Sequence, residues 1–259
     1  MRVRRHRAGV LVAALLAVAL LVAACASSGG GASPSTQPGA STATVPRSTT
    51  TTTAAASTTA TTATSPTLTT PTDGPSVRDR LAVLTIDDRP SPVGTYRRED
   101  WPHWKDPDGN GCDARQDTLV LWSTTPATVD RSKGCKVLAG TWVSPYDGKV
   151  TASPADIQID HMVPLAEAFR SGGWQWDAGR RRQFANDPIE LVAASASSNN
   201  AKSDSPPNEW RPPRTESWCA YADRWVTVKA TYGLTVTTEE RDALGQMLDT
   251  CTLVSERWP

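Results

Sequence analysis

The sequence predicts an α+β fold with little sheet, built as one domain over residues 77–259. Two long segments near the C-terminal end, 216–233 and 237–251, have apolar residues at the spacing of amphipathic helices. Shorter runs, such as 136–143 and 157–161, alternate apolar and polar residues as strands do. The length suits one domain, and this region holds all ten tryptophans of the chain, enough large side chains for a single core.

Local signals place the other elements. The turn S-P-Y-D-G at 144–148 predicts a hairpin, and the segment 114–122 fits either a helix or a strand. Ser76 is an expected helix cap, and Thr237 with Glu240 forms a capping box. The remaining strands are expected at 149–151, 157–161 and 189–194. The remaining helices are expected at 77–88, 164–170, 176–187 and 195–202, and a Pro-, Gly- and Asp-rich loop at 89–113.

The N-terminus has the layout of a secretory signal. Four arginines within the first seven residues precede an apolar stretch that ends in V-A-A-C at Cys25, and this stretch is short for a membrane span. The small residues before Cys25 resemble a bacterial lipobox, which implies cleavage before Cys25 and a lipid on its sulfur. An ordinary signal peptide is the alternative. Residues 1–25 are therefore expected to direct export.

Residues 26–76 consist almost wholly of Ser, Thr, Ala, Gly and Pro. Such a segment cannot bury enough apolar surface to offset the entropy lost on ordering. We expect a disordered tether between the signal and the domain.

The charge of the domain argues against a broad nucleic-acid-binding surface. Five of the 27 basic and one of the 27 acidic residues precede residue 77, so the domain carries 22 basic and 26 acidic residues, a net charge of −4. Proteins that hold DNA mainly by neutralising phosphates are usually basic. Binding would need a local patch, for which 180–182, Arg211 and Arg214 are candidates; solvated surface is the alternative.

The cysteines predict two disulfides. With Cys25 assigned to the lipid, four remain, and an exported domain can oxidise them. Cys112–Cys135 and Cys219–Cys251 is the expected pairing among three, because each pair is nearest in sequence. A zinc site is the alternative, but the chain lacks the Cys-x-x-Cys spacing that structural zinc usually uses.

One acid–histidine pair stands at the end of a predicted strand. The run I-Q-I-D-H-M-V-P contains Asp160 and His161, and N-N-A-K-S-D follows about forty residues later, beginning at Asn199. Carboxylate and amide oxygens suit a hard divalent cation, and a histidine free of the metal can act as a general base on water. The alternative from the residues alone is a hydrogen-bonded core histidine and a helix-capping asparagine.

The order and spacing of these two motifs resemble the HNH, or ββα-metal, nuclease motif. The closer likeness is to exported actinobacterial HNH-family proteins that share the C-terminal domain of GmrSD-type restriction endonucleases. Further shared pieces are W-P-H-W-K-D-P-D-G-N-G-C-D-A-R, S-P-Y-D-G, F-A-N-D-P, N-E-W-R-P-P and W-C-A-Y-A. The resemblance implies a ββα-metal core within a mostly helical, disulfide-linked single domain.

The resemblance also implies roles for individual residues. His161 is the expected general base, and Asp160 and Asn199 are the expected ligands of one Mg²⁺ or Mn²⁺ ion. The family's central asparagine, which holds the loop behind the histidine, falls at Glu190, whose carboxylate cannot donate amide hydrogen bonds. Either Asn186 replaces it, or the loop is held differently.

Three further residues are expected to support the site. Lys202 either contacts a phosphate or lies on the helix surface; Arg115 either reaches the site or forms a structural ion pair; Glu167 is a candidate to orient His161. His103, between aromatic residues, is expected to be a packed or loop histidine.

The expected function is a monomeric, metal-dependent endonuclease of low specificity. It would act on DNA rather than RNA, outside the cytoplasm, either anchored to the outer face of the membrane through Cys25 or secreted. One alternative is a catalytically weak surface module that binds DNA or cell wall. Another is a structural lipoprotein held by disulfides.

Overall fold

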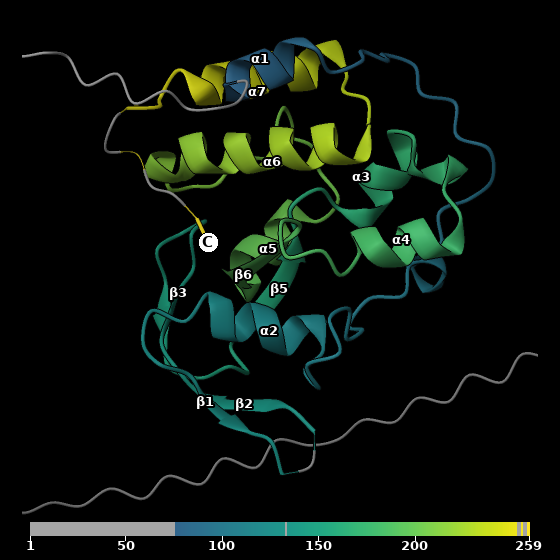
Figure 1. The fold of residues 1–259 in the computed structure, drawn as a ribbon. Coiled ribbons are helices and arrows are strands. Elements are labelled where there is room, and N and C mark those ends of the chain that lie inside the picture. Colours follow the sequence, from purple (N-terminus) through teal and green to yellow (C-terminus); the bar gives the residue numbers. More distant parts are fainter. Residues whose placement is uncertain (1–75, 133, 253–254, 256–257) are drawn as a thin grey trace, which may run out of the picture. The chain divides into compact units, whose positions relative to one another are not determined.

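A computed structural model of the chain describes residues 76–132, 134–252, 255 and 258–259 (Figure 1). The expected signal peptide, the Cys25 lipidation site and the tether up to residue 75 lie outside the described residues. Within the described part, no helix is long and apolar enough to cross a membrane.

The described residues form helices joined by very small sheets, which confirms the α+β class. The helices are α1 (Val77–Ala82), η1 (Arg98–Asp100), α2 (Ala114–Leu121), α3 (Leu165–Arg170), η2 (Gly173–Gln175), α4 (Ala178–Phe184), α5 (Ala196–Lys202), η3 (Thr215–Ser217), α6 (Trp218–Tyr232) and α7 (Thr238–Leu248). The strands are β1 (Thr128–Asp130), β2 (Lys136–Ala139), β3 (Trp142–Val143), β4 (Val150–Thr151), β5 (Ile157–His161) and β6 (Leu191–Ser195).

The strands pair in three separate antiparallel ribbons, β1 with β2, β3 with β4, and β5 with β6. The β5–β6 ribbon is central, and its register pairs Ile157 with Ser195 and His161 with Leu191. All five residues of β6 are buried, and α5 follows β6 directly and packs against both strands. The chain thus forms a strand–strand–helix unit whose two strands are separated by α3 and α4 in sequence.

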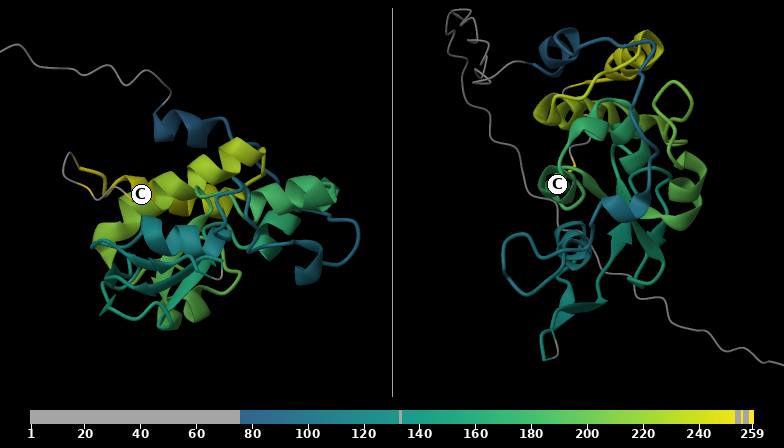
Figure 2. Two further views of the ribbon diagram at one scale, coloured as in Figure 1. Left: turned by 60° about the horizontal axis from the view of Figure 1, so that its bottom comes forward. Right: turned by 90° about the vertical axis from the view of Figure 1, so that its right-hand side faces the viewer.

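Helix α6 joins the central ribbon to the outer helices. It packs against α1 and α7 and buries Tyr221, Trp225, Val226 and Val228. Figures 1 and 2 show α1 and α7 on one side of α6 and the β5–β6 ribbon with α5 on the other. The capping predictions are confirmed: Ser76 caps α1, and Thr237 with Glu240 forms a capping box at α7.

Two sequence-based boundaries are wrong. The helix expected over 77–88 ends at Ala82, because Ile86 forms a bridge to Val236 and the Asp87 N–H donates to the Val236 carbonyl. The run 136–143 is not one strand: β2 pairs with β1 and β3 pairs with β4. The break falls at Gly140, where a Cβ atom would lie 2.6 Å from the Ser123 hydroxyl. Long-range pairing overrode the local pattern in both places.

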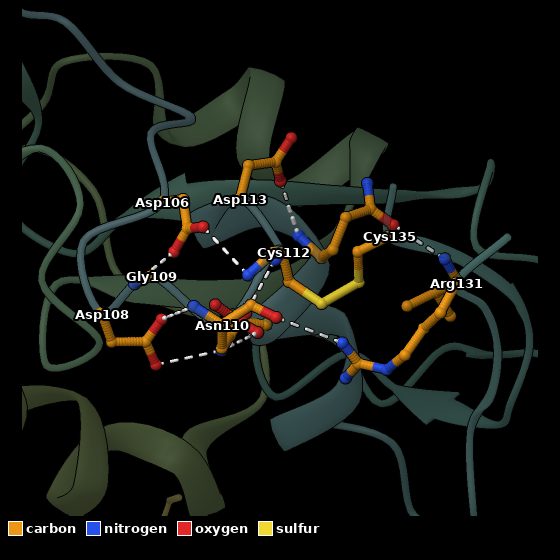
Figure 3. Close-up of a disulfide and its surroundings, with 12 residues drawn as sticks. Asp106, Asp108, Gly109, Asn110, Cys112, Asp113, Arg131 and Cys135 are labelled. Carbon is orange, nitrogen blue, oxygen red and sulfur yellow. Dashed lines mark hydrogen bonds between the residues drawn. A yellow bond between two sulfur atoms is a disulfide. The ribbon is translucent and has the colours of Figure 1, made fainter. Parts of the chain in front are cut away.

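Both predicted disulfides are present. Cys112–Cys135 links the start of α2 to the start of β2, and Cys219–Cys251 links the first turn of α6 to the segment after α7. Figure 3 shows the loop beside the first bridge, where the Asp106 carboxylate accepts hydrogen bonds from the Gly109 and Gly111 N–H groups. The bridge and this loop fix the beginning of α2.

Candidate active site at the end of β5

Strand β5 ends at a cleft with a volume of about 470 Å³. Asp160, His161 and Asn199, the three principal residues predicted from sequence, all line it. Asp160 and His161 come from β5, and Asn199 comes from α5, which packs on that strand. The structure therefore brings together residues about forty positions apart in the chain.

His161 is held as a neutral imidazole. Its Nε2 lies 3.0 Å from the Ala185 carbonyl and donates to it, which leaves Nδ1 as the nitrogen with a free lone pair. Burial lowers the pKa of His161 to about 3, and the positive charge of Arg98 acts in the same direction. The Trp104 ring stacks on the imidazole, with 5.8 Å between the ring centroids. At neutral pH the ring can accept a proton.

Asp160 is a buried carboxylate with two side-chain partners. The Tyr146 hydroxyl donates to Oδ2 at 2.6 Å, and the Lys202 ammonium lies 2.9 Å from Oδ2 and 3.1 Å from Oδ1. Burial raises the pKa of Asp160, whereas the charge of Lys202 and the Tyr146 hydrogen bond oppose that increase. The ion pair fixes the carboxylate at the edge of the cleft.

Lys202 supports the site from behind. Its ammonium donates to the His161 carbonyl at 2.8 Å as well as to Asp160, and its side chain has no exposed surface. A fully buried ammonium has no access to a substrate phosphate. Lys202 was expected either to contact a phosphate or to lie on the helix surface, and it does neither. Its hydrogen bonds instead link α5 to the end of β5.

Glu190 holds the loop that follows His161. Its Oε1 accepts from the Val163 N–H at 3.0 Å, and its backbone carbonyl accepts from the Met162 N–H at 2.7 Å. The side chain is fully buried, and burial raises the pKa of Glu190 well above 4.5, which favours the neutral carboxylic acid. A buried glutamate thus secures the loop from the position that asparagine occupies in the family pattern.

Asn186 has a different task from the one expected. Its Oδ1 accepts from the Lys105 N–H, and its Nδ2 donates to the Pro102 and Arg182 carbonyls. It ties the segment carrying His103 and Trp104 to α4, and that segment covers His161. Its influence on the imidazole is therefore indirect.

The expected roles of Arg115 and Glu167 are also corrected. Arg115 donates to the Pro154 and Ile157 carbonyls, which anchors the start of β5, and no carboxylate among the described residues pairs with it. Glu167 bonds Lys229 and Arg170, each at 3.0 Å, and so points toward α6 instead of orienting His161. Both residues are structural.

Asn199 is positioned by the first turn of α5. Ser195 caps this helix, and the Asp147 carboxylate accepts from the hydroxyls of Ser195 and Ser198. Burial opposes ionisation of Asp147, but these hydroxyl hydrogen bonds prevail and lower its pKa to about 2. The Asn199 Nδ2 donates to Gln158, which leaves its Oδ1 as the oxygen available at the cleft.

The donor set fits a hard divalent cation with few protein ligands. A carboxylate has about four lone-pair sites, and Tyr146 and Lys202 do not use all of those on Asp160. The part of the chain that the structure describes contains no group of three or more His, Cys, Asp or Glu placed to hold a metal. Asp160 and Asn199 would therefore share the ion with water and substrate oxygens, as Mg²⁺ commonly does.

Sequence reasoning missed three residues around the cleft: Tyr146, Trp104 and Arg98. The sequence places Tyr146 in a turn, and nothing local signals its hydrogen bond to Asp160. Trp104 has a positive φ of 55°, an uncommon conformation for a bulky residue that often accompanies function. Arg98 starts the short helix η1 and reaches the cleft only through the tertiary fold.

Comparison with known proteins decides the family. The family model described as GmrSD restriction endonucleases, C-terminal domain, matches residues 117–247. The chain belongs to the GmrSD C-terminal domain family. The matched range contains β5, β6 and α5, and thus the principal residues of the cleft.

A fungal protein is similar to this chain over a longer range. An "Uncharacterized secreted protein" of Arthroderma benhamiae is 40% identical over 174 residues, which cover 66% of this chain and 82% of the relative. No solved structure matches the chain. Membership of the GmrSD C-terminal domain family indicates a nuclease-like protein, and neither match bears on the expected actinobacterial type.

Proposed function

We propose that this protein is an HNH-type endonuclease that hydrolyses phosphodiester bonds with the help of one Mg²⁺ or Mn²⁺ ion. The observation that carries the proposal is a neutral histidine with an available nitrogen in the same cleft as two oxygen ligands. The strand–strand–helix arrangement of β5, β6 and α5 is compatible with a ββα-metal core. Family membership supports a nuclease-like activity.

His161 acts as the general base in this mechanism. Its Nδ1 accepts a proton from the attacking water, while the Ala185 carbonyl holds Nε2–H and thereby fixes the tautomer. A phosphate in the cleft brings negative charge near the ring, which favours the protonated imidazole and raises its affinity for the proton. Glu190 and Lys202 hold the backbone on either side of the base.

Asp160 and Asn199 would hold the cation. A bound divalent ion would supply charge neutralisation for the phosphate and the leaving oxygen. Asp160 is already fixed by Tyr146 and Lys202, so its carboxylate needs little rearrangement to bind. Low sequence specificity and a preference for DNA over RNA are part of the proposal.

The action is proposed to take place outside the cytoplasm. The secreted relative and the two disulfides support an exported protein. Attachment of a lipid to Cys25 and a monomeric state are further parts of the proposal.

Plasmid nicking tests this function. The purified protein should nick plasmid DNA with Mg²⁺ or Mn²⁺ and stop when EDTA is added. His161→Ala should lower the rate by about 10²- to 10⁴-fold, the usual contribution of a general base. The variant's urea midpoint serves as the control for folding. Failure of the protein to nick with any divalent metal would contradict the proposal.

A second candidate is a catalytically weak module that binds DNA or cell wall. The Asp160–Lys202 ion pair favours it, because this pair satisfies the carboxylate without a metal. DNA binding without cleavage, unchanged in His161→Ala, would support this candidate. A structural lipoprotein would instead show neither DNA binding nor a higher melting temperature with Mn²⁺.

A further inference from the structure

Among the described residues, one charged side chain of the cleft forms no ion pair with an opposite charge. The charged residues lining it are Arg98, Asp160 and Asp204, since His161 is neutral. Asp160 pairs with Lys202, and Asp204 pairs with Arg170 at 2.8 Å. Among the described residues, no carboxylate forms an ion pair with Arg98.

The neighbouring sequence explains why Arg98 stays available. Arg97 forms ion pairs with the two acidic residues of η1, at 3.1 Å to Asp100 and 3.9 Å to Glu99. Arg98 is exposed and starts η1, the short helix at the edge of the cleft. The charge of Arg98 also reaches His161, since it opposes protonation of that imidazole.

Two other basic residues that were expected to support the site have structural partners. Lys202 is buried against Asp160, and Arg115 binds backbone carbonyls at the start of β5. The domain carries a net negative charge, so a cation at the cleft that has no acidic partner among the described residues favours the approach of a polyanion there. A guanidinium can bind two phosphate oxygens at once through its planar fork.

We propose that Arg98 binds the phosphate group that is to be cleaved, next to His161 and opposite the oxygens of Asp160 and Asn199. This inference rests on the proposed endonuclease function and names its substrate contact. Arg98 holds the phosphate in the cleft and balances the negative charge that grows as water attacks. Arg98 is exposed at the start of η1, so its side chain can adjust to the backbone of a bound strand.

The first experiment compares nicking by three variants. Arg98→Ala should lower kcat/KM by about 10²-fold, the usual cost of losing one donor to a developing charge. Arg98→Lys keeps the positive charge but loses the planar fork of the guanidinium. Its rate should therefore fall between those of the wild type and Arg98→Ala. Arg78→Ala is the matched control: Arg78 is an exposed arginine on α1, paired with Asp249, and its loss changes the net charge equally. A rate for Arg98→Ala equal to that of Arg78→Ala would overturn the inference.

The second experiment measures binding without chemistry. Fluorescence anisotropy of a labelled DNA duplex is followed against salt in the His161→Ala background. Arg98→Ala should reduce the slope of log Kd against log salt by about 1, as expected for one lost phosphate contact, and Arg78→Ala should leave it unchanged. An unchanged slope, or no DNA binding at all, counts against Arg98.

The two experiments separate this inference from the proposed function. Absence of nicking together with Arg98-dependent DNA binding would overturn the endonuclease proposal and keep the phosphate contact. Nicking that depends on His161 but not on Arg98 would keep the endonuclease and overturn the contact.

Discussion

Removal of the Lys202 ammonium should lower the free energy of unfolding of this domain far more than removal of an exposed lysine ammonium. Lys202 is fully buried and makes bonds of 2.8–3.1 Å to both Asp160 oxygens and to the His161 carbonyl. In Lys202→Met, the methylenes are largely replaced but the charge is lost. Asp160 then keeps only the Tyr146 hydroxyl, and its burial no longer has a compensating cation.

The size of the effect follows from the geometry. Breaking a buried ion pair by removing one partner costs about 3–5 kcal/mol, because an uncompensated charge stays buried. Asp160→Asn alone should also destabilise, since it leaves the Lys202 ammonium without its counter-charge. The double variant Asp160→Asn, Lys202→Met should lose less than the sum, with a coupling energy of about 1–3 kcal/mol.

Urea unfolding of the oxidised protein at pH 7 measures these values. The disulfides must stay intact so that unfolding remains close to two-state. Lys149→Met is the matched control: Lys149 is 62% exposed and lies 3.5 Å from Asp147, so its loss should cost no more than about 1 kcal/mol. The reasoning would be refuted if Lys202→Met lost no more free energy of unfolding than Lys149→Met. It would also be refuted if the double variant lost the sum of the two single losses.

Two further predictions concern pH. Glu190→Gln should keep the acceptor for Val163 N–H and should gain stability relative to wild type as pH rises above 4.5, because a buried acid with a raised pKa holds a proton that the unfolded chain releases. Urea midpoints of both proteins at pH 5 and 8 check this. Parallel pH profiles of the two proteins would contradict it. Asp147 has a lowered pKa, so wild type should lose stability relative to Asp147→Asn as pH falls from 3.8 to about 2. Melting temperatures at pH 4, 3 and 2 measure that loss, and a constant difference between the two proteins would argue against it.

Much of the local structure could be predicted, because local chemistry determines it. The caps at Ser76 and Thr237 are hydrogen bonds within one turn, and they lie where the residue types indicated. The pairing Cys112–Cys135 and Cys219–Cys251 follows sequence proximity. Boundaries failed where distant backbone competed, as at 83–88, where Val236 pairs with the segment predicted as helix.

The supporting contacts of the site were the least predictable part. Glu190 lacks the amide donors of the family's asparagine, so the loop behind His161 was expected to be held by Asn186 or in a different way, yet the buried Glu190 carboxyl itself accepts from the Val163 N–H. The burial of Glu190 could not be read from the sequence, and the protonation of its carboxyl depends on that burial. The assignments of Lys202, Asn186, Arg115 and Glu167 failed for the same reason, since their partners come from other elements.

The chemical groups of the site and of the disulfides could be read from the sequence: an aspartate and a histidine at a strand end, an asparagine on a following helix, and four cysteines that are close in sequence two by two. Residue types and short spacings carry that information, because strand ends, caps and motifs are local. Only the tertiary structure decided the state of the groups. It buried His161 and Glu190, paired Asp160 with Lys202, and placed Arg98 at the cleft with no acidic partner among the described residues. Charge state and access depend on what packs around a side chain, and that is set by contacts between segments far apart in the chain.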